Sequence, residues 1–248
     1  MRRTLNRLIA AAIGAAAFGG VANASTVYDT SLVAPGVYFG SGNPNTDWTV
    51  NTDGSIELGL ATIHREVGAV VPTSTNIYNV PTGNDSPFNS ARAWWNFNFS
   101  VNLRAGGTGT LTLGDVTPTL QIQDYLHGTS LTFNPFTAFP DNSAFDGTNT
   151  RNGNVSGQQA TTGDVGFQNS ENLVFFPSLG FDMNANDTFL ITLSLLNNSD
   201  NSSLGSVSEY VVVGTGAPTP LPAAAPLFAS GLAGLGWLAR RRKKKQIA

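Results

Sequence analysis

Residues 95–103 read Trp-Asn-Phe-Asn-Phe-Ser-Val-Asn-Leu, and this stretch decides the fold class. Apolar residues occupy every odd position from Trp95 to Leu103, and polar residues occupy every even position between them. A strict period of two is typical of a β-strand that buries one face and exposes the other to water. We therefore predict a strand here, with its asparagines and serine on the solvent face.

The flanking sequence extends this pattern in both directions. The glycine-rich residues 105–109 predict a turn, and Thr110 to Leu113 would return as the second strand of a hairpin. Upstream, the apolar residues of 56–63 alternate until Ala61 interrupts the period, which predicts a strand with a bulge.

Further short apolar runs recur along the chain between Gly-, Asn- and Pro-containing turns. They lie at residues 118–126, 131–133, 173–176, 188–195 and 207–213. About eight strands at this spacing, without a sustained helical period, predict an all-β antiparallel β-sandwich of jelly-roll-like type. The polar, glycine-rich residues 134–170 interrupt the pattern, and we expect an extended surface loop there.

The N-terminus has the three parts of a secretory signal peptide. Arginines at positions 2, 3 and 7 precede an apolar run from Leu8 to Ala22, and Ala22-Asn23-Ala24 supplies the small residues of a cleavage site. The alternative is an N-terminal membrane anchor, but the run is short of the roughly 20 residues that a span needs. We therefore expect residues 1–24 to be removed during export.

The C-terminus, residues 218–248, carries a second tripartite segment after the expected body of residues 25–217. A short proline motif is followed by 17 apolar residues, Ala223–Ala239, and then by a basic cluster. The motif is Pro220, Leu221, Pro222 and Ala223, and the cluster is Arg240, Arg241, Arg242, Lys243, Lys244 and Lys245. The apolar segment is at the lower limit for a transmembrane helix, roughly 17–25 residues. The basic cluster would hold the end of the chain in the cytoplasm.

This C-terminal segment resembles the PEP-CTERM sorting signal, and more narrowly its VPLPA variant. Thr219 stands where that variant has Val, and Leu221 stands where the name-giving form has Glu. The resemblance implies a Gram-negative bacterium that makes exopolysaccharide, and processing of the tail by an exosortase-type enzyme. It further implies an inner-membrane intermediate and then a cell-surface or extracellular-matrix location. A plain tail anchor without processing is the alternative.

The charge of the chain is divided unequally between body and ends. The body has four arginines and no lysine against 16 acidic residues, which gives it a formal charge of −12. Such a surface repels nucleic acid, so we expect no nucleic-acid partner. The chain has no cysteine, which excludes disulfides, thiolate metal sites and cysteine nucleophiles.

Few residues of the body suggest a catalytic or metal-binding role, and we predict that the protein is not an enzyme. No Gly-x-Ser-x-Gly motif is present, and His64 and His127 lack a partner motif, which favours a structural role for both. The remaining candidate is an oxygen-rich run that could bind Ca²⁺, namely Asp182, Asn184, Asn186 and Asp187. The alternative is an Asx-rich turn that needs no ion.

Trp94 is a candidate platform for a sugar ring, because it points to the face opposite Trp95. The alternative, which we favour, is that a loop or the second sheet covers it. The function expected from the sequence is therefore an exported, non-catalytic surface or extracellular-matrix protein. A carbohydrate-binding module, stabilised by Ca²⁺ and contacting extracellular polysaccharide, is the alternative. A glycoside hydrolase is a weaker one, because no pair of carboxylates stands out.

Overall fold

The computed structural model describes residues 25–216 apart from 34–35, 40–42 and 74. The expected signal peptide and the expected sorting signal with its membrane helix lie outside the described residues. Within the described part of the chain, no helix has the length and apolarity needed to cross a membrane.

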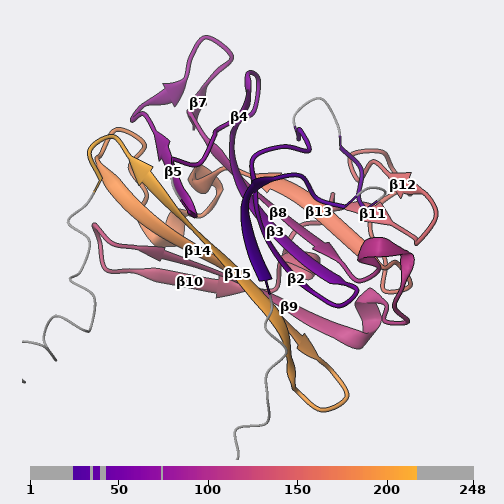
Figure 1. Cartoon of the computed structure of the whole chain (residues 1–248). Coiled ribbons are helices and arrows are strands. Elements are labelled where there is room, and N and C mark those ends of the chain that lie inside the picture. Colours follow the sequence, from indigo (N-terminus) through magenta and orange to yellow (C-terminus); the bar gives the residue numbers. More distant parts are fainter. Residues whose placement is uncertain (1–24, 34–35, 40–42, 74, 217–248) are drawn as a thin grey trace, which may run out of the picture.

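The larger of the two main sheets contains eight strands (Figure 1). Its order is β1–β2–β3–β8–β13–β11–β12, with β4 paired to β3, and all pairs are antiparallel. The strands are β1 (Ser25–Thr30), β2 (Trp48–Asp53), β3 (Ile56–His64), β4 (Gly68–Ala69), β8 (Asn96–Asn102), β11 (Ser143–Phe145), β12 (Thr150–Arg151) and β13 (Gly166–Glu171).

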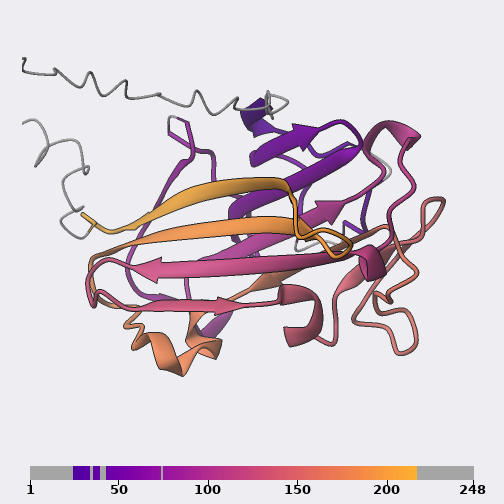
Figure 2. The same ribbon diagram turned by 90° about the horizontal axis from the view of Figure 1, so that it is seen from below.

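The smaller sheet contains five strands in the order β10–β9–β14–β15–β5. These are β5 (Ile77–Val80), β9 (Val116–Asp124), β10 (Ser130–Phe133), β14 (Asp187–Asn197) and β15 (Ser203–Val213). Figure 2 shows β10, β9, β14 and β15 side by side as one layer. Only β5 runs parallel to its neighbour, β15. A hairpin of β6 (Asn84–Asp85) and β7 (Asn89–Ala93) stands apart from both sheets.

The core lies between the inner faces of the two main sheets, which confirms the all-β sandwich. Leu58 of β3 and Phe99 of β8 share one apolar cluster with Ile122 of β9 and Ile191 of β14, and all four are fully buried. On β14, fully buried apolar residues alternate with partly exposed ones, as expected for a strand with one wet face. The strands predicted at 118–126, 131–133, 188–195 and 207–213 are thereby confirmed as β9, β10, β14 and β15.

The strand predicted at 95–103 is confirmed as β8, but its predicted wet face is wrong. Every residue of β8 is buried, and Asn98 and Ser100 are 0% and 1% exposed. Described residues between β1 and β2, among them Leu32, Val33 and Gly36, pack on this outer face of the larger sheet. There the Leu32 side chain lies so close to Gly59 that a Cβ atom at that position would collide with it. The amide of Val33 donates to the carboxylate of Glu57 at 3.0 and 3.2 Å.

The predicted hairpin after β8 is also wrong, because β8 pairs with β3 and β13 instead. Residues 105–115 hold two short 3-10 turns, Ala105–Gly107 and Leu113–Asp115, and lead from the larger sheet to β9 of the smaller one. The predicted bulge near Ala61 is wrong as well, since β3 pairs with β8 in unbroken register from Glu57 to Ile63. Ala61 interrupts the apolar period only because both faces of β3 are buried.

Residues 134–170 are not the extended surface loop predicted from their composition. They contain a helical turn, α1 (Pro135–Ala138), and the strands β11 and β12, and they run into β13. The strand predicted at 173–176 is a 3-10 turn, Leu173–Phe175, whose N-cap is Asn172. A further 3-10 turn, Pro177–Leu179, follows and leads towards β14. The polar composition of residues 134–170 gave no signal for β11 and β12, because side-chain hydrogen bonds as well as backbone pairing hold these strands.

Candidate functional site

The expected sorting residues lie outside the part of the chain that the structure describes. They are Pro220, Leu221, Pro222 and Ala223 of the proline motif and Arg240, Arg241, Arg242, Lys243, Lys244 and Lys245 of the basic cluster. The candidate sites below are therefore built from residues of the sandwich.

The residues expected to hold Ca²⁺ make hydrogen bonds to different parts of the chain. Asp182 Oδ1 accepts from the amide of Asn184 at 2.9 Å, which makes an Asx turn. Asn186 Oδ1 accepts from the amide of Thr215 at 3.0 Å and so ties this turn to the end of β15. Asp187 begins β14 and turns to a different set of neighbours. These hydrogen bonds of Asp182 and Asn186 are consistent with the turn alternative, and the Ca²⁺ site stays a prediction.

Asp187 lies instead with Asp124 and His127, and one ligand-type atom from each of the three lies within 4.8 Å of the others. Asp124 ends β9 and Asp187 begins the adjacent strand β14, so sheet pairing brings the two carboxylates together. His127 lies in the tight turn between β9 and β10, where Asp124 Oδ1 accepts from its backbone amide at 2.7 Å. Asp124 Oδ2 contacts His127 Nδ1 at 2.8 Å.

The electrostatics of this cluster follow from two buried like charges beside one imidazole. Asp124 and Asp187 are 0% and 1% exposed. Burial raises the pKa of Asp187 to about 6, the amides of Thr188 and Leu126 oppose the rise, and the charge of Asp124 adds to it. The hydrogen bond to Asp124 raises the pKa of His127, and the negative charges of Asp124, Asp187 and Asp182 act in the same direction.

Trp94 is half-buried rather than displayed as an open platform. Its ring stacks on His64, with centroids 4.2 Å apart and planes inclined at 23°. His64 is itself buried, and its Nε2 contacts Asp85 Oδ1 at 2.6 Å, which ties the end of β3 to the β6–β7 hairpin. Hydrogen bonds to aspartate thus account for both histidines of the chain.

Exposed aromatic rings do occur near Trp94, although not at Trp94 itself. Phe88, in the turn of the β6–β7 hairpin, is 56% exposed and meets the His64 ring edge-on. Phe175 is 52% exposed, and the guanidinium of Arg92 lies 5.7 Å from its ring centroid. Within the described chain, neither Arg92 nor Arg65 forms an ion pair, and both lower the pKa of the nearby Glu171. We call Phe88, Trp94, Phe175, Arg65 and Arg92 the aromatic–arginine patch.

Glu171 is the acidic neighbour of this patch and ends β13. Burial raises its pKa to about 8, the charge of Asp141 adds to the rise, and Arg65 and Arg92 only partly oppose it. The arginines of the patch therefore face a carboxyl group that is largely neutral at pH 7, which leaves their charge available to an external anion.

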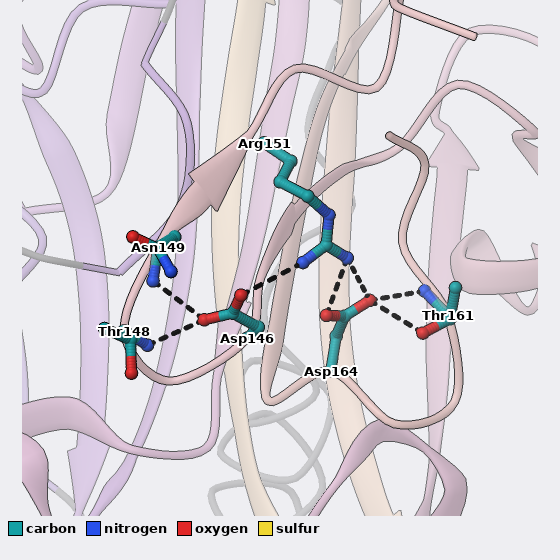
Figure 3. Close-up of polar contacts among 6 residues, drawn as sticks. All are labelled: Asp146, Thr148, Asn149, Arg151, Thr161 and Asp164. Carbon is teal, nitrogen blue, oxygen red and sulfur yellow. Dashed lines mark hydrogen bonds and ion pairs between the residues drawn. The ribbon is translucent and has the colours of Figure 1, made fainter. Parts of the chain in front are cut away.

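A third polar cluster, centred on Arg151 of β12, is structural (Figure 3). Its Nη2 atom donates to both carboxylate oxygens of Asp164 at 2.7 Å, and Nη1 donates to Asp146 at 3.4 Å. Asp164 also accepts from the amide and hydroxyl of Thr161. Amides of residues 148 and 149 donate to Asp146 and lower the pKa of that carboxyl. The cluster fastens the region that the sequence predicted to be a loop.

The described surface includes two open hollows of appreciable size. One, of about 570 Å³, is lined by Pro140, Asp141, Gly153, Asn154, Ser156 and Gln159. The other, of about 360 Å³, is lined by Leu111, Gly114, Asp115, Asn197, Asn198 and Ser199. Each has a single carboxylate in its lining, whereas the glycosidase alternative requires a facing pair.

Comparison with known proteins shows little similarity. No protein-family model matches the chain, and no curated protein matches it. Among solved structures, the PmoD soluble domain from Methylocystis sp. ATCC 49242 (Rockwell) aligns with 66% of this chain and 96% of its own. The TM-score is 0.30 and the sequence identity is 10%. A similarity this low carries no inference about function.

Proposed function

We propose that this chain is an exported, non-catalytic protein of the cell surface or extracellular matrix. A cleaved signal peptide would direct its export, and the C-terminal segment would hold it in the inner membrane until an exosortase-type enzyme processes it. One observation carries the proposal: the order of proline motif, apolar segment and basic cluster at the C-terminus, opposite an N-terminal signal. The assignment of the sandwich to the jelly-roll type stays a prediction.

The charge distribution supports this proposal. Lysines are confined to the C-terminal cluster, while the body carries −12. Removal of both ends would leave a strongly acidic domain whose like charges keep copies apart in solution. An acidic sandwich without cysteine needs neither metal-thiolate nor disulfide bonds to persist outside the cell.

A truncation after Thr219 tests the sorting proposal. The truncated chain should be released into the periplasm or medium, while the full chain is retained at the envelope or in the matrix. Deletion of Gln246, Ile247 and Ala248 alone is the matched control, because it shortens the chain but leaves the motif and basic cluster intact. Unchanged retention of the truncated chain would refute the proposal.

The second candidate, polysaccharide binding, is favoured by the aromatic–arginine patch. Exposed aromatic rings can stack on the apolar faces of sugars, and unpaired guanidinium groups bind carboxylates with two parallel hydrogen bonds. Together they fit an anionic polysaccharide, such as one that contains uronic acids. Phe88 and Phe175 would make the principal contacts, because His64 covers one face of Trp94.

A glycan array that includes acidic polysaccharides tests this candidate, with and without Ca²⁺. We expect binding to acidic glycans that is lost in a Phe88→Ala, Phe175→Ala double variant. Leu196, which is 37% exposed on β14, provides a control because Leu196→Ala removes a similar surface group elsewhere. No binding in either condition would leave only the sorting proposal.

A further inference from the structure

The cluster of Asp124, His127 and Asp187 has the composition of a metal site. Two carboxylates and one imidazole supply the oxygen and nitrogen ligands that Zn²⁺ and related ions accept, whereas Ca²⁺ takes oxygen almost alone. In a tetrahedral zinc site the ligand atoms lie about 3.4 Å apart, as bond lengths of about 2.1 Å require. The three ligand atoms here already lie within 4.8 Å of one another.

The backbone holds both carboxylates in place for such an ion. Asp124 Oδ1 accepts from the amide of His127, and Asp187 Oδ1 accepts from the amides of Leu126 and Thr188. Backbone amides therefore fix one oxygen of each aspartate. Asp124 Oδ2 contacts the His127 ring, and Asp187, which is 99% buried, has a carboxylate oxygen within 4.8 Å of the ligand atoms of both.

Within the described chain, the two buried aspartates have one cationic partner between them. His127 contacts Asp124, and no arginine of the described residues forms an ion pair with either carboxylate. Asp182 adds a further negative charge near His127. Two buried carboxylates beside a single imidazole are costly, and a divalent ion would compensate both aspartates together. The His127 side chain is 37% exposed, so an ion can reach the cluster from solvent.

We infer that Asp124, His127 and Asp187 bind a divalent transition-metal ion of the Zn²⁺ class. The ion would join the end of β9 to the start of β14 and to the β9–β10 turn. Its fourth position would face solvent on the side of the exposed imidazole. The site is independent of the proposed sorting function. It shares only Asp187 with the Ca²⁺ site predicted from sequence, and it differs from that site in metal class.

Calorimetric titration of the full-length, metal-free chain in detergent with ZnCl₂ tests the inference, with CaCl₂ as the comparison. One Zn²⁺ should bind per chain, and Ca²⁺ should bind more weakly. His127→Ala and Asp187→Asn should each weaken Zn²⁺ binding by roughly 100-fold or more, because even indirect neighbours of metal ligands change affinity by about 10–100-fold. Asp200→Asn is the matched control, since Asp200 is an exposed acid in the β14–β15 turn.

Thermal unfolding distinguishes a variant that has lost the metal site from one that fails to fold. Zn²⁺ should raise the melting temperature of the wild type and of Asp200→Asn but not of His127→Ala, whose altered side chain is partly exposed. The inference is overturned if the wild type does not bind Zn²⁺, if His127→Ala binds it equally well, or if Ca²⁺ binds more tightly. None of these outcomes bears on the retention of the truncated chain.

Discussion

The carboxyl group of Glu209 is fully buried between the two sheets, where the hydroxyl of Thr62 donates to it at 3.4 Å. Glu209 lies on β15 of the smaller sheet and Thr62 on β3 of the larger one, so this contact crosses the core. Burial raises the pKa of Glu209 well above its usual range, and the bond from Thr62 only partly opposes the rise. The folded protein therefore favours the protonated, neutral form of this carboxyl group.

Glu209 should make the protein less stable as pH rises. Its contribution to stability is complete below its unfolded pKa of about 4.3 and is lost as pH rises towards the higher folded value, with a slope of at most about 1.4 kcal/mol per pH unit. Glu209→Gln cannot ionise and should lose this slope. Urea unfolding of both proteins at several pH values from 5 to 8, spaced about one unit apart, measures the difference in slope. Equal slopes for the wild type and the variant would contradict the assignment.

Ser100 should cost stability rather than provide it. Its Oγ is buried on β8 and has no hydrogen-bond partner in the described structure, and the same holds for both amide atoms of its cross-strand neighbour Gln168. A buried hydroxyl without a partner costs about 1–3 kcal/mol. Ser100→Ala should therefore raise the free energy of unfolding by about 1 kcal/mol. Destabilisation of this variant would show that the hydroxyl is hydrogen-bonded in solution.

Asn172 should be among the most sensitive polar positions. Its fully buried Nδ2 donates to the carbonyl oxygens of Ala93 and Trp95 at 3.0 and 2.9 Å, and its Oδ1 accepts from the amide of Ala93. Asn172→Ala leaves these backbone groups unpaired and should cost about 3 kcal/mol. Thermal unfolding beside Asn198→Ala, an exposed asparagine, provides the comparison. Similar losses for both variants would exclude a special role for Asn172.

The two ion pairs of Arg151 should contribute differently to stability. Asp164 is buried and receives two bonds from Arg151 at 2.7 Å, whereas the Asp146 side chain is 37% exposed and receives one at 3.4 Å. Arg151→Ala leaves the Asp164 carboxylate uncompensated and should cost about 2 kcal/mol, since Arg151 itself is partly exposed. Asp146→Asn should cost less than about 1 kcal/mol. Hydrogen exchange of residues 143–151 in both variants locates the loss, and equal effects would contradict the ranking.

The sequence predicts the strands of the smaller sheet better than those of the larger one. On β14 the outer face is partly exposed, so the alternation from Phe189 to Leu195 reports burial directly. On β8 the same alternation misleads, because described residues after β1 pack on the polar face. The local alternation shows which side chains are apolar, but it does not show which distant segment covers a sheet.

The candidate metal site shows the same limit. Asp187 was selected from its neighbours in sequence, whereas its partners Asp124 and His127 lie about 60 residues away and meet it only because β9 pairs with β14. The local signal available was Asp124-x-x-His127 at the end of a predicted strand. Strand order, which sequence alone does not supply here, was needed to connect it with Asp187.

The sorting proposal is tested by determining at which residues the mature protein begins and ends. Intact-mass and peptide mass spectrometry of the protein isolated from its native envelope or matrix would determine both. The sorting proposal predicts an N-terminus at Ser25 and a C-terminus close to the Pro220-Leu221-Pro222 motif, without the basic cluster. A mature chain that still carries Arg240 to Lys245 would contradict it.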